Sequence, residues 1–209
     1  MIYEVQVQGY FSVNCYFIID EETGHGFLID PGAQGEALAR MIRQRGWTIE
    51  KILLTHGHFD HTGGIEAIRR ELDIPVYIHR NGEDYLTDPR LNLSRFCGPD
   101  VIVRGANFLR DGDTVSLKES GACSLRVLHT PGHTPDSVTF YCAEERAAFV
   151  GDAIFKGSPG TAQYPGGNGA QLIQSVREKI LRLPEDTTLY SGHSEPTRVE
   201  MESHLYYRT

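Results

Sequence analysis

Short apolar runs separated by polar turns dominate the hydrophobic pattern of this chain, and most runs have the length of a strand rather than of a helix. Strands are predicted for residues 3–7, 14–20, 26–29, 49–54, 76–78, 114–118, 124–128, 138–141, 147–150 and 188–190. Some runs, such as Ile52-Leu53-Leu54, are apolar at every position, which is typical of strands that are buried on both faces.

Helical spacing of apolar residues appears between the strands. One helix is predicted over residues 35–45, a second is marked by Ile65, Ile68 and Leu72, and a third is predicted over residues 171–183. A terminal helix contains His204, and the polar stretch 80–99 has no predicted element. Because both halves of the chain alternate strands with helices, the pattern favours the α/β class.

Composition agrees with one compact domain over residues 1–209, since the chain is 40% hydrophobic and 23% charged. A net charge of -8 argues against a nucleic-acid surface. The sequence has no apolar run of about 18 residues and no secretory signal at its start, so we expect a cytoplasmic protein without a membrane span. Cys15, Cys97, Cys123 and Cys142 form no Cys-x-x-Cys pair and are expected to be mostly buried, reduced thiols.

The chemistry of the chain is concentrated in Thr55-His56-Gly57-His58-Phe59-Asp60-His61, which follows an apolar strand and precedes a helix. Imidazole and carboxylate together suit zinc, iron or manganese. Such groups are costly to bury without a partner. The run therefore predicts a metal site in a strand-to-helix loop.

Three further loops place a possible ligand just after an apolar strand and next to a glycine. They carry His133 in Thr130-Pro131-Gly132-His133, Asp152 in Gly151-Asp152, and His193 in Ser191-Gly192-His193. Sites gather at the carboxyl ends of strands in α/β folds, where loops meet at a rigid edge. We therefore expect all four loops to contribute to one binuclear centre.

These motifs resemble those of the metallo-β-lactamase superfamily, and in particular its small, single-domain glyoxalase II-like hydrolases. The resemblance covers nearly the whole chain and includes Asn14-Cys15-Tyr16, Asp30-Pro31-Gly32 and residues 164–168. It implies a four-layer αββα sandwich with the centre at one edge between the sheets. It also implies that one divalent ion is held by His56, His58 and His133, the other by Asp60, His61 and His193, with Asp152 bridging both.

The resemblance further implies an enzyme that cleaves a small-molecule thioester, such as an S-2-hydroxyacylglutathione. The expected nucleophile is a hydroxide shared by two metal ions. Zinc is the expected metal, and iron and manganese are the alternatives. Asp60 is the expected catalytic residue, which would orient the hydroxide and later receive its proton. Asp30 has two interpretations: it orients the histidine loop, or it only forms a turn before Pro31-Gly32.

Substrate contacts are expected from Lys156, Thr161 and Tyr164. Gly160-Thr161 stands where glyoxalase II-like proteins commonly have Gly-Arg or Gly-Lys, so this chain lacks the cation that helps to bind a glutathione carboxylate there. Lys156 and Arg198 are the candidates to supply this charge instead, with a solvated surface cation as the other interpretation of each. Tyr206 and Tyr207, like Tyr164, are candidate walls of the pocket.

Three alternatives to a thioesterase remain open from the sequence. A persulfide dioxygenase resembles the same family but uses a single iron, while a lactonase or phosphodiesterase would use the same hydroxide on another bond. A non-catalytic metal-binding protein is the third. The remaining histidines, His25, His79, His129 and His204, are not predicted as ligands, and the sequence does not fix the oligomeric state.

Overall fold

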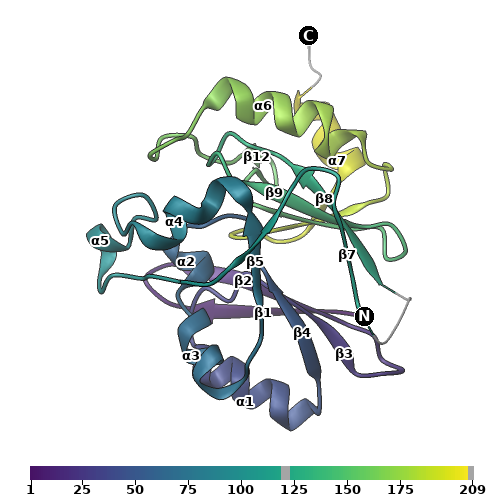
Figure 1. The fold of residues 1–209 in the computed structure, drawn as a ribbon. Coiled ribbons are helices and arrows are strands. Elements are labelled where there is room, and N and C mark those ends of the chain that lie inside the picture. Colours follow the sequence, from purple (N-terminus) through teal and green to yellow (C-terminus); the bar gives the residue numbers. More distant parts are fainter. Residues whose placement is uncertain (119–122, 207–209) are drawn as a thin grey trace.

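Two six-stranded sheets pack face to face in the computed structural model, which describes residues 1–118 and 123–206 (Figure 1). The first sheet has the order β1 (Ile2–Gln8), β2 (Ser12–Ile19), β3 (His25–Ile29), β4 (Thr48–Leu53), β5 (Val76–His79) and β6 (Asn107–Leu109). The second has the order β14 (Thr197–Arg198), β13 (Thr188–Ser191), β10 (Ala147–Gly151), β9 (Val138–Cys142), β8 (Ser124–His129) and β7 (Thr114–Ser116). A separate hairpin joins β11 (Ile154–Phe155) to β12 (Ser158–Pro159).

Helices cover the outer face of each sheet. On the first sheet lie α1 (Gly35–Arg45) and α3 (Ile65–Glu71), and on the second lie α6 (Gly169–Glu178), η2 (Ile180–Arg182) and α7 (Val199–Tyr206) (Figure 1). Short helices fill the connections: α2 (Phe59–Thr62), η1 (Arg80–Gly82), α4 (Glu83–Thr87) and α5 (Ser94–Cys97). The predicted four-layer αββα sandwich is confirmed.

Strand alternation explains why the sheets are buried on both sides. In β2, Phe17 and Ile19 belong to the apolar cluster beneath α1 and α3, whereas Tyr16 and Ile18 belong to the cluster between the two sheets. A third cluster lies under α6 and α7. Burying each large apolar side chain contributes about 1.5 to 3 kcal/mol, so three layers of such contacts hold the ends of the strands in fixed positions.

The structure differs from the predicted elements in several places. Helices η1, α4 and α5 lie in the stretch 80–99, for which no element was predicted. Strand β6 has only three residues, two of them exposed, which is too short to give a periodic signal. The predicted helix over 171–183 begins earlier, where the Asn168 side chain caps it, and ends at Glu178. His25 begins β3 instead of lying in the turn, and it contacts Glu50 at 2.9 Å.

Within the described residues, no helix is long and apolar enough to cross a membrane. Cys15, Cys123 and Cys142 are buried free thiols as predicted, whereas Cys97 is partly exposed.

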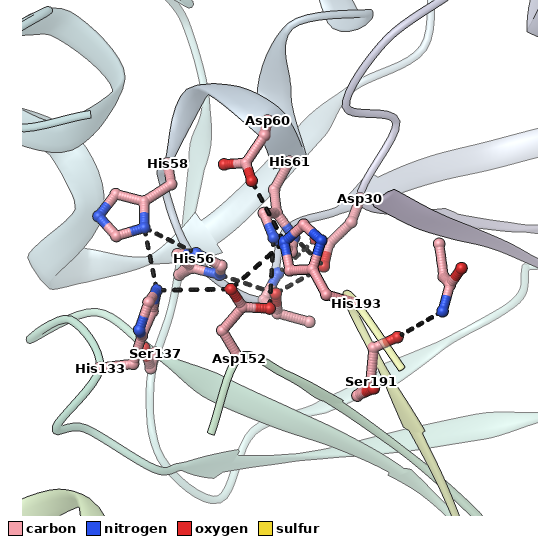
Figure 2. Close-up of polar contacts among 12 residues, drawn as sticks. Asp30, His56, His58, Asp60, His61, His133, Ser137, Asp152, Ser191 and His193 are labelled. Atoms are coloured by element: carbon pink, nitrogen blue, oxygen red, sulfur yellow. Dashed lines mark hydrogen bonds and ion pairs between the residues drawn. The ribbon is translucent and has the colours of Figure 1, made fainter. Parts of the chain in front are cut away.

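The strands that precede the candidate ligands end at one edge of the sandwich. In the second sheet, β10 is parallel to β13, and both β8 and β10 are antiparallel to β9, so β8, β10 and β13 run in the same direction. The loops after these three strands carry His133, Asp152 and His193. They face the loop after β4 in the first sheet, which carries the histidine run (Figure 2).

Asp136 is a fully buried carboxyl group in the loop between β8 and β9. Among the described residues, none offers either carboxyl oxygen a hydrogen bond of good geometry. Burial raises the pKa of Asp136 from 3.8 to about 6, and the nearby Thr134 side chain and Gly57 backbone offset this only in part. The folded protein therefore carries an ionised, poorly solvated carboxylate at neutral pH.

We predict that Asp136→Asn makes the stability of the protein less dependent on pH. A raised folded-state pKa gives the wild type stability that is fully present below pH 3.8 and is lost as pH rises through about 6. Relative to the variant, the wild type should lose about 2 kcal/mol of unfolding free energy between pH 4.5 and pH 7.5. Urea unfolding of both metal-free proteins measures this, and parallel pH curves would contradict it.

Candidate metal centre

Seven side chains from the four loops converge at the edge between the sheets (Figure 2). Their ligand atoms form three overlapping groups, each with all atoms within 4.8 Å of one another: His56, His58, His133; His56, His61, Asp152; and Asp60, His61, His193. The structure thus brings together every residue that was predicted as a metal ligand.

The first group consists of three imidazoles. Nε2 of His56 lies 3.1 Å from Nδ1 of His58, and Nε2 of His133 lies 3.0 Å from the same atom. Burial and the neighbouring His61 hold the pKa of His56 well below its usual value, and burial and His133 lower the pKa of His58 to about 3. His56 and His58 are therefore uncharged at neutral pH, and each ring keeps one unprotonated nitrogen whose lone pair can bind a cation.

The third group, which is formed by Asp60, His61 and His193, combines imidazole with carboxylate. Nε2 of His193 lies 3.2 Å from Oδ2 of Asp60. Burial alone would raise the pKa of Asp60, but His61 and the hydrogen bond from His193 lower it. Burial would also lower the pKa of His61, but Asp152, Asp30 and Asp60 raise it well above its usual value. A cation that binds here must displace a proton.

Asp152 lies between the first group and the third. Its Oδ1 is 3.5 Å from Nε2 of His61, and its Oδ2 is 3.7 Å from Nε2 of His133 and 3.5 Å from Nε2 of His193. Burial would raise the pKa of Asp152, but His61, His133 and His193 hold it well below its usual range. A Cβ on Gly192 would lie 2.4 Å from Oδ1 of Asp152, so only glycine leaves room for this carboxylate.

The donor set fits divalent metal ions. Nε2 of His61 and Oδ1 of Asp152 are buried and face each other, yet neither makes a hydrogen bond within the described part of the chain. Buried polar atoms rarely lack a partner. Nitrogen and carboxylate donors arranged around a common centre are the ligands that zinc, iron and manganese accept.

A second layer of contacts orients four of the five histidines through Nδ1, which leaves Nε2 pointing at the centre. The partners of Nδ1 are Thr55 Oγ1 for His56 at 3.1 Å, Asp30 Oδ2 for His61 at 2.9 Å, Thr161 O for His133 at 2.6 Å and Ser12 O for His193 at 2.8 Å. His58 differs, because its Nδ1 points at the centre.

In this second layer, Asp30 contacts both Thr55 and His61. Its Oδ1 accepts a hydrogen bond from the backbone N–H of Thr55 at 2.8 Å, and its Oδ2 accepts one from the Thr55 hydroxyl at 2.6 Å. The same Oδ2 lies 2.9 Å from Nδ1 of His61. Of the two interpretations of Asp30, the structure therefore supports the orienting role.

A pocket of about 230 Å³ opens beside the centre, and Thr161 and Tyr164 line it together with the ligands. Lys156 does not line it, because its Nζ contacts Oε2 of Glu195 at 2.6 Å. Tyr206 lies in the apolar cluster under α7, and Tyr207 falls outside the described residues.

The sequence did not reveal four apolar residues that line the pocket: Phe11, Phe59, Leu93 and Phe155. Phe11 follows Tyr10 in the turn between β1 and β2, and two aromatic residues in an exposed turn are the only local signal of this role. His79 and His129 are not in the centre; their rings stack on each other with centroids 4.0 Å apart.

We predict that Asp30→Asn lowers the affinity for zinc about 10- to 100-fold, because the histidine loop loses the carboxylate that orients Thr55 and His61. Zinc titration against a chromophoric chelator measures the change. Asp73→Asn, at an exposed position outside the centre, is the matched control and should bind zinc like the wild type. Unchanged affinity in Asp30→Asn would contradict an orienting role.

Comparisons with known proteins agree with this geometry. The chain is 38% identical to the probable metallo-hydrolase YqgX of Bacillus subtilis over 195 residues, which span 93% of this chain and 90% of that protein. It is 31% identical to the hydroxyacylglutathione hydrolase GloC of Haemophilus influenzae, across 92% of this chain and 90% of that protein.

Solved structures show the same fold. The BLEG-1 B3 metallo-beta-lactamase aligns with a TM-score of 0.90 at 35% identity, covering 98% of this chain and 97% of that one. TTHA1623, solved in a di-iron-bound form, aligns with a TM-score of 0.83 at 32% identity, covering 96% of each chain. The family model of the metallo-beta-lactamase superfamily matches residues 9–193. The chain therefore belongs to the metallo-beta-lactamase superfamily.

Proposed function

We propose that the protein is a metal-dependent hydrolase that cleaves a thioester of a small 2-hydroxy acid. The observation that carries the proposal is the pair of donor groups that meet at Asp152 beside an open pocket. In this proposal His56, His58 and His133 hold one divalent ion, Asp60, His61 and His193 hold the other, and Asp152 contacts both. Zinc is the metal we expect, while the di-iron form of TTHA1623 makes iron the first alternative.

A pair of divalent ions supplies an activated water and polarises the carbonyl group that it attacks. The side chains of the protein position the water and the substrate and accept the proton. Asp60 is ionised because its pKa is lowered, and it lines the pocket, where its carboxylate can orient the water and then accept a proton. Thr161 and Tyr164 lie where they can contact the acyl group.

The thioester class rests on the likeness to GloC. The lining of the pocket does not favour glutathione as the thiol carrier. Within the described residues that line the pocket, no lysine or arginine is present. Lys156 is occupied by Glu195. A glutathione carboxylate would therefore forgo a charge-assisted hydrogen bond worth about 1.5 to 3 kcal/mol.

We predict that metal-replete protein hydrolyses S-lactoylglutathione at a measurable rate and loses the activity on chelation. The loss of thioester absorbance measures turnover, and added zinc, manganese or iron should restore it. Turnover that survives chelation, with metal analysis confirming less than one ion per ten chains, would contradict a metal-dependent mechanism.

Failure of hydrolysis in protein that holds two ions would point to another thiol carrier. A single bound iron together with oxygen uptake on a persulfide would instead identify the dioxygenase alternative.

We also predict that Asp60→Asn lowers kcat about 10²- to 10⁴-fold, because an amide cannot accept the proton. Activity is compared at metal concentrations that keep two ions bound per chain, which separates proton transfer from ion binding. Asp73→Asn should leave kcat unchanged. Wild-type kcat in Asp60→Asn with both ions bound would refute the assignment.

A further inference from the structure

A second cavity of about 590 Å³ lies next to the pocket at the metal centre. It is bounded by the β1–β2 turn, the loop before α1, the start of α3 and residues 97–102. Phe11, Phe59 and Asp60 line both cavities, so the two spaces share a wall beside the centre. The two cavities therefore lie on either side of the same three side chains.

Aromatic side chains form the shared wall. The ring centroids of Phe11 and Phe59 are 6.0 Å apart, and Tyr10 lies 5.0 Å from Phe11 in an edge-to-face arrangement. Tyr10 is 64% exposed and Phe11 44% exposed. Exposed aromatic and apolar side chains that gather around a cavity mark a binding surface, because their burial by a ligand is favourable.

The charged residues that line this cavity are all acidic: Asp60, Glu66 and Asp100. Asp100 lies 2.7 Å from Arg95, and Glu66 lies 3.5 Å from Arg69, but neither arginine lines the cavity. Across the described part of the chain, the cavity wall contains no lysine, arginine or histidine. An anionic group would have to be desolvated here beside the carboxylates of Glu66 and Asp100, without a cationic side chain from the wall, which is unfavourable.

We propose that this cavity binds the thiol-side group of the substrate, and that this group is uncharged and aromatic or branched-alkyl. The inference rests on the proposed function. The pocket at the centre, at about 230 Å³, suits the small acyl group, so the larger half of the thioester extends past Phe11 and Phe59 into the larger cavity. Tyr10 is then a specificity residue, since it lines the larger cavity and not the pocket at the centre.

The test compares two lactoyl thioesters of ordinary alkyl thiols, one of phenylmethanethiol and one of 3-mercaptopropionate. We expect kcat/KM to be at least tenfold higher for the phenylmethyl thioester. Tyr10→Ala should raise KM for that ester fivefold or more and change KM for the anionic ester less than twofold. Tyr10→Lys should reduce or reverse the preference in kcat/KM for the phenylmethyl thioester over the anionic thioester. Equal kcat/KM for the two esters in the wild type would overturn the proposal.

Phe108→Ala is the matched control, because Phe108 is an exposed aromatic residue on β6 that lines neither cavity. This variant should leave both KM values unchanged. A KM increase as large as that in Tyr10→Ala would show that the effect does not depend on the cavity and would overturn the assignment.

A binding measurement separates this inference from the proposed function. The probe is the ketone analogue of the phenylmethyl thioester, in which CH₂ replaces sulfur, titrated calorimetrically into the zinc-loaded protein. Weaker binding to Tyr10→Ala than to the wild type and Phe108→Ala supports the cavity as the site even where no thioester is turned over. Equal affinity in all three proteins overturns it even where thioesters are hydrolysed.

Discussion

The carboxylate of Asp30 determines where the histidine loop lies. Residues in the loop after β4 must leave a strand of the first sheet and present side chains to loops of the second sheet. Asp30 stabilises this turn because its carboxylate accepts hydrogen bonds from the backbone N–H and the hydroxyl of Thr55 while it also contacts Nδ1 of His61. Thr55 in turn contacts Nδ1 of His56, so one buried carboxylate orients imidazoles of both donor groups.

Contacts between the sheets hold the other side of the centre in the same way. The Asn14 side chain donates hydrogen bonds to the carbonyls of Ser191 and Ser194, and the Tyr16 hydroxyl donates to Ser191. Val138 N donates to Thr55 O, which joins β9 to the histidine loop. The centre is therefore fixed by polar contacts that cross between the sheets, in addition to the apolar cluster between them.

Much of the fold and the ligand set could be predicted from the sequence, because the information is local. Strands buried on both faces appear as continuous apolar runs, and each of the four ligand loops directly follows a predicted strand and contains a glycine. What could not be predicted depends on distant partners. The ion pair between Lys156 and Glu195 joins residues 39 positions apart. Phe11 becomes part of the pocket wall only when the β1–β2 turn folds over α2. The short strand β6 has no pattern of its own.

The order of the ligands along the chain has a consequence for biosynthesis. Asp30 and the histidine run belong to the first third of the chain, whereas His193 follows β13 near its end. During synthesis, the early histidines leave the ribosome long before β13, the strand that precedes His193, can pair with β10. The group of Asp60, His61 and His193 thus cannot assemble on a partial chain. Completion of the second sheet therefore controls when the protein gains its full set of ligands.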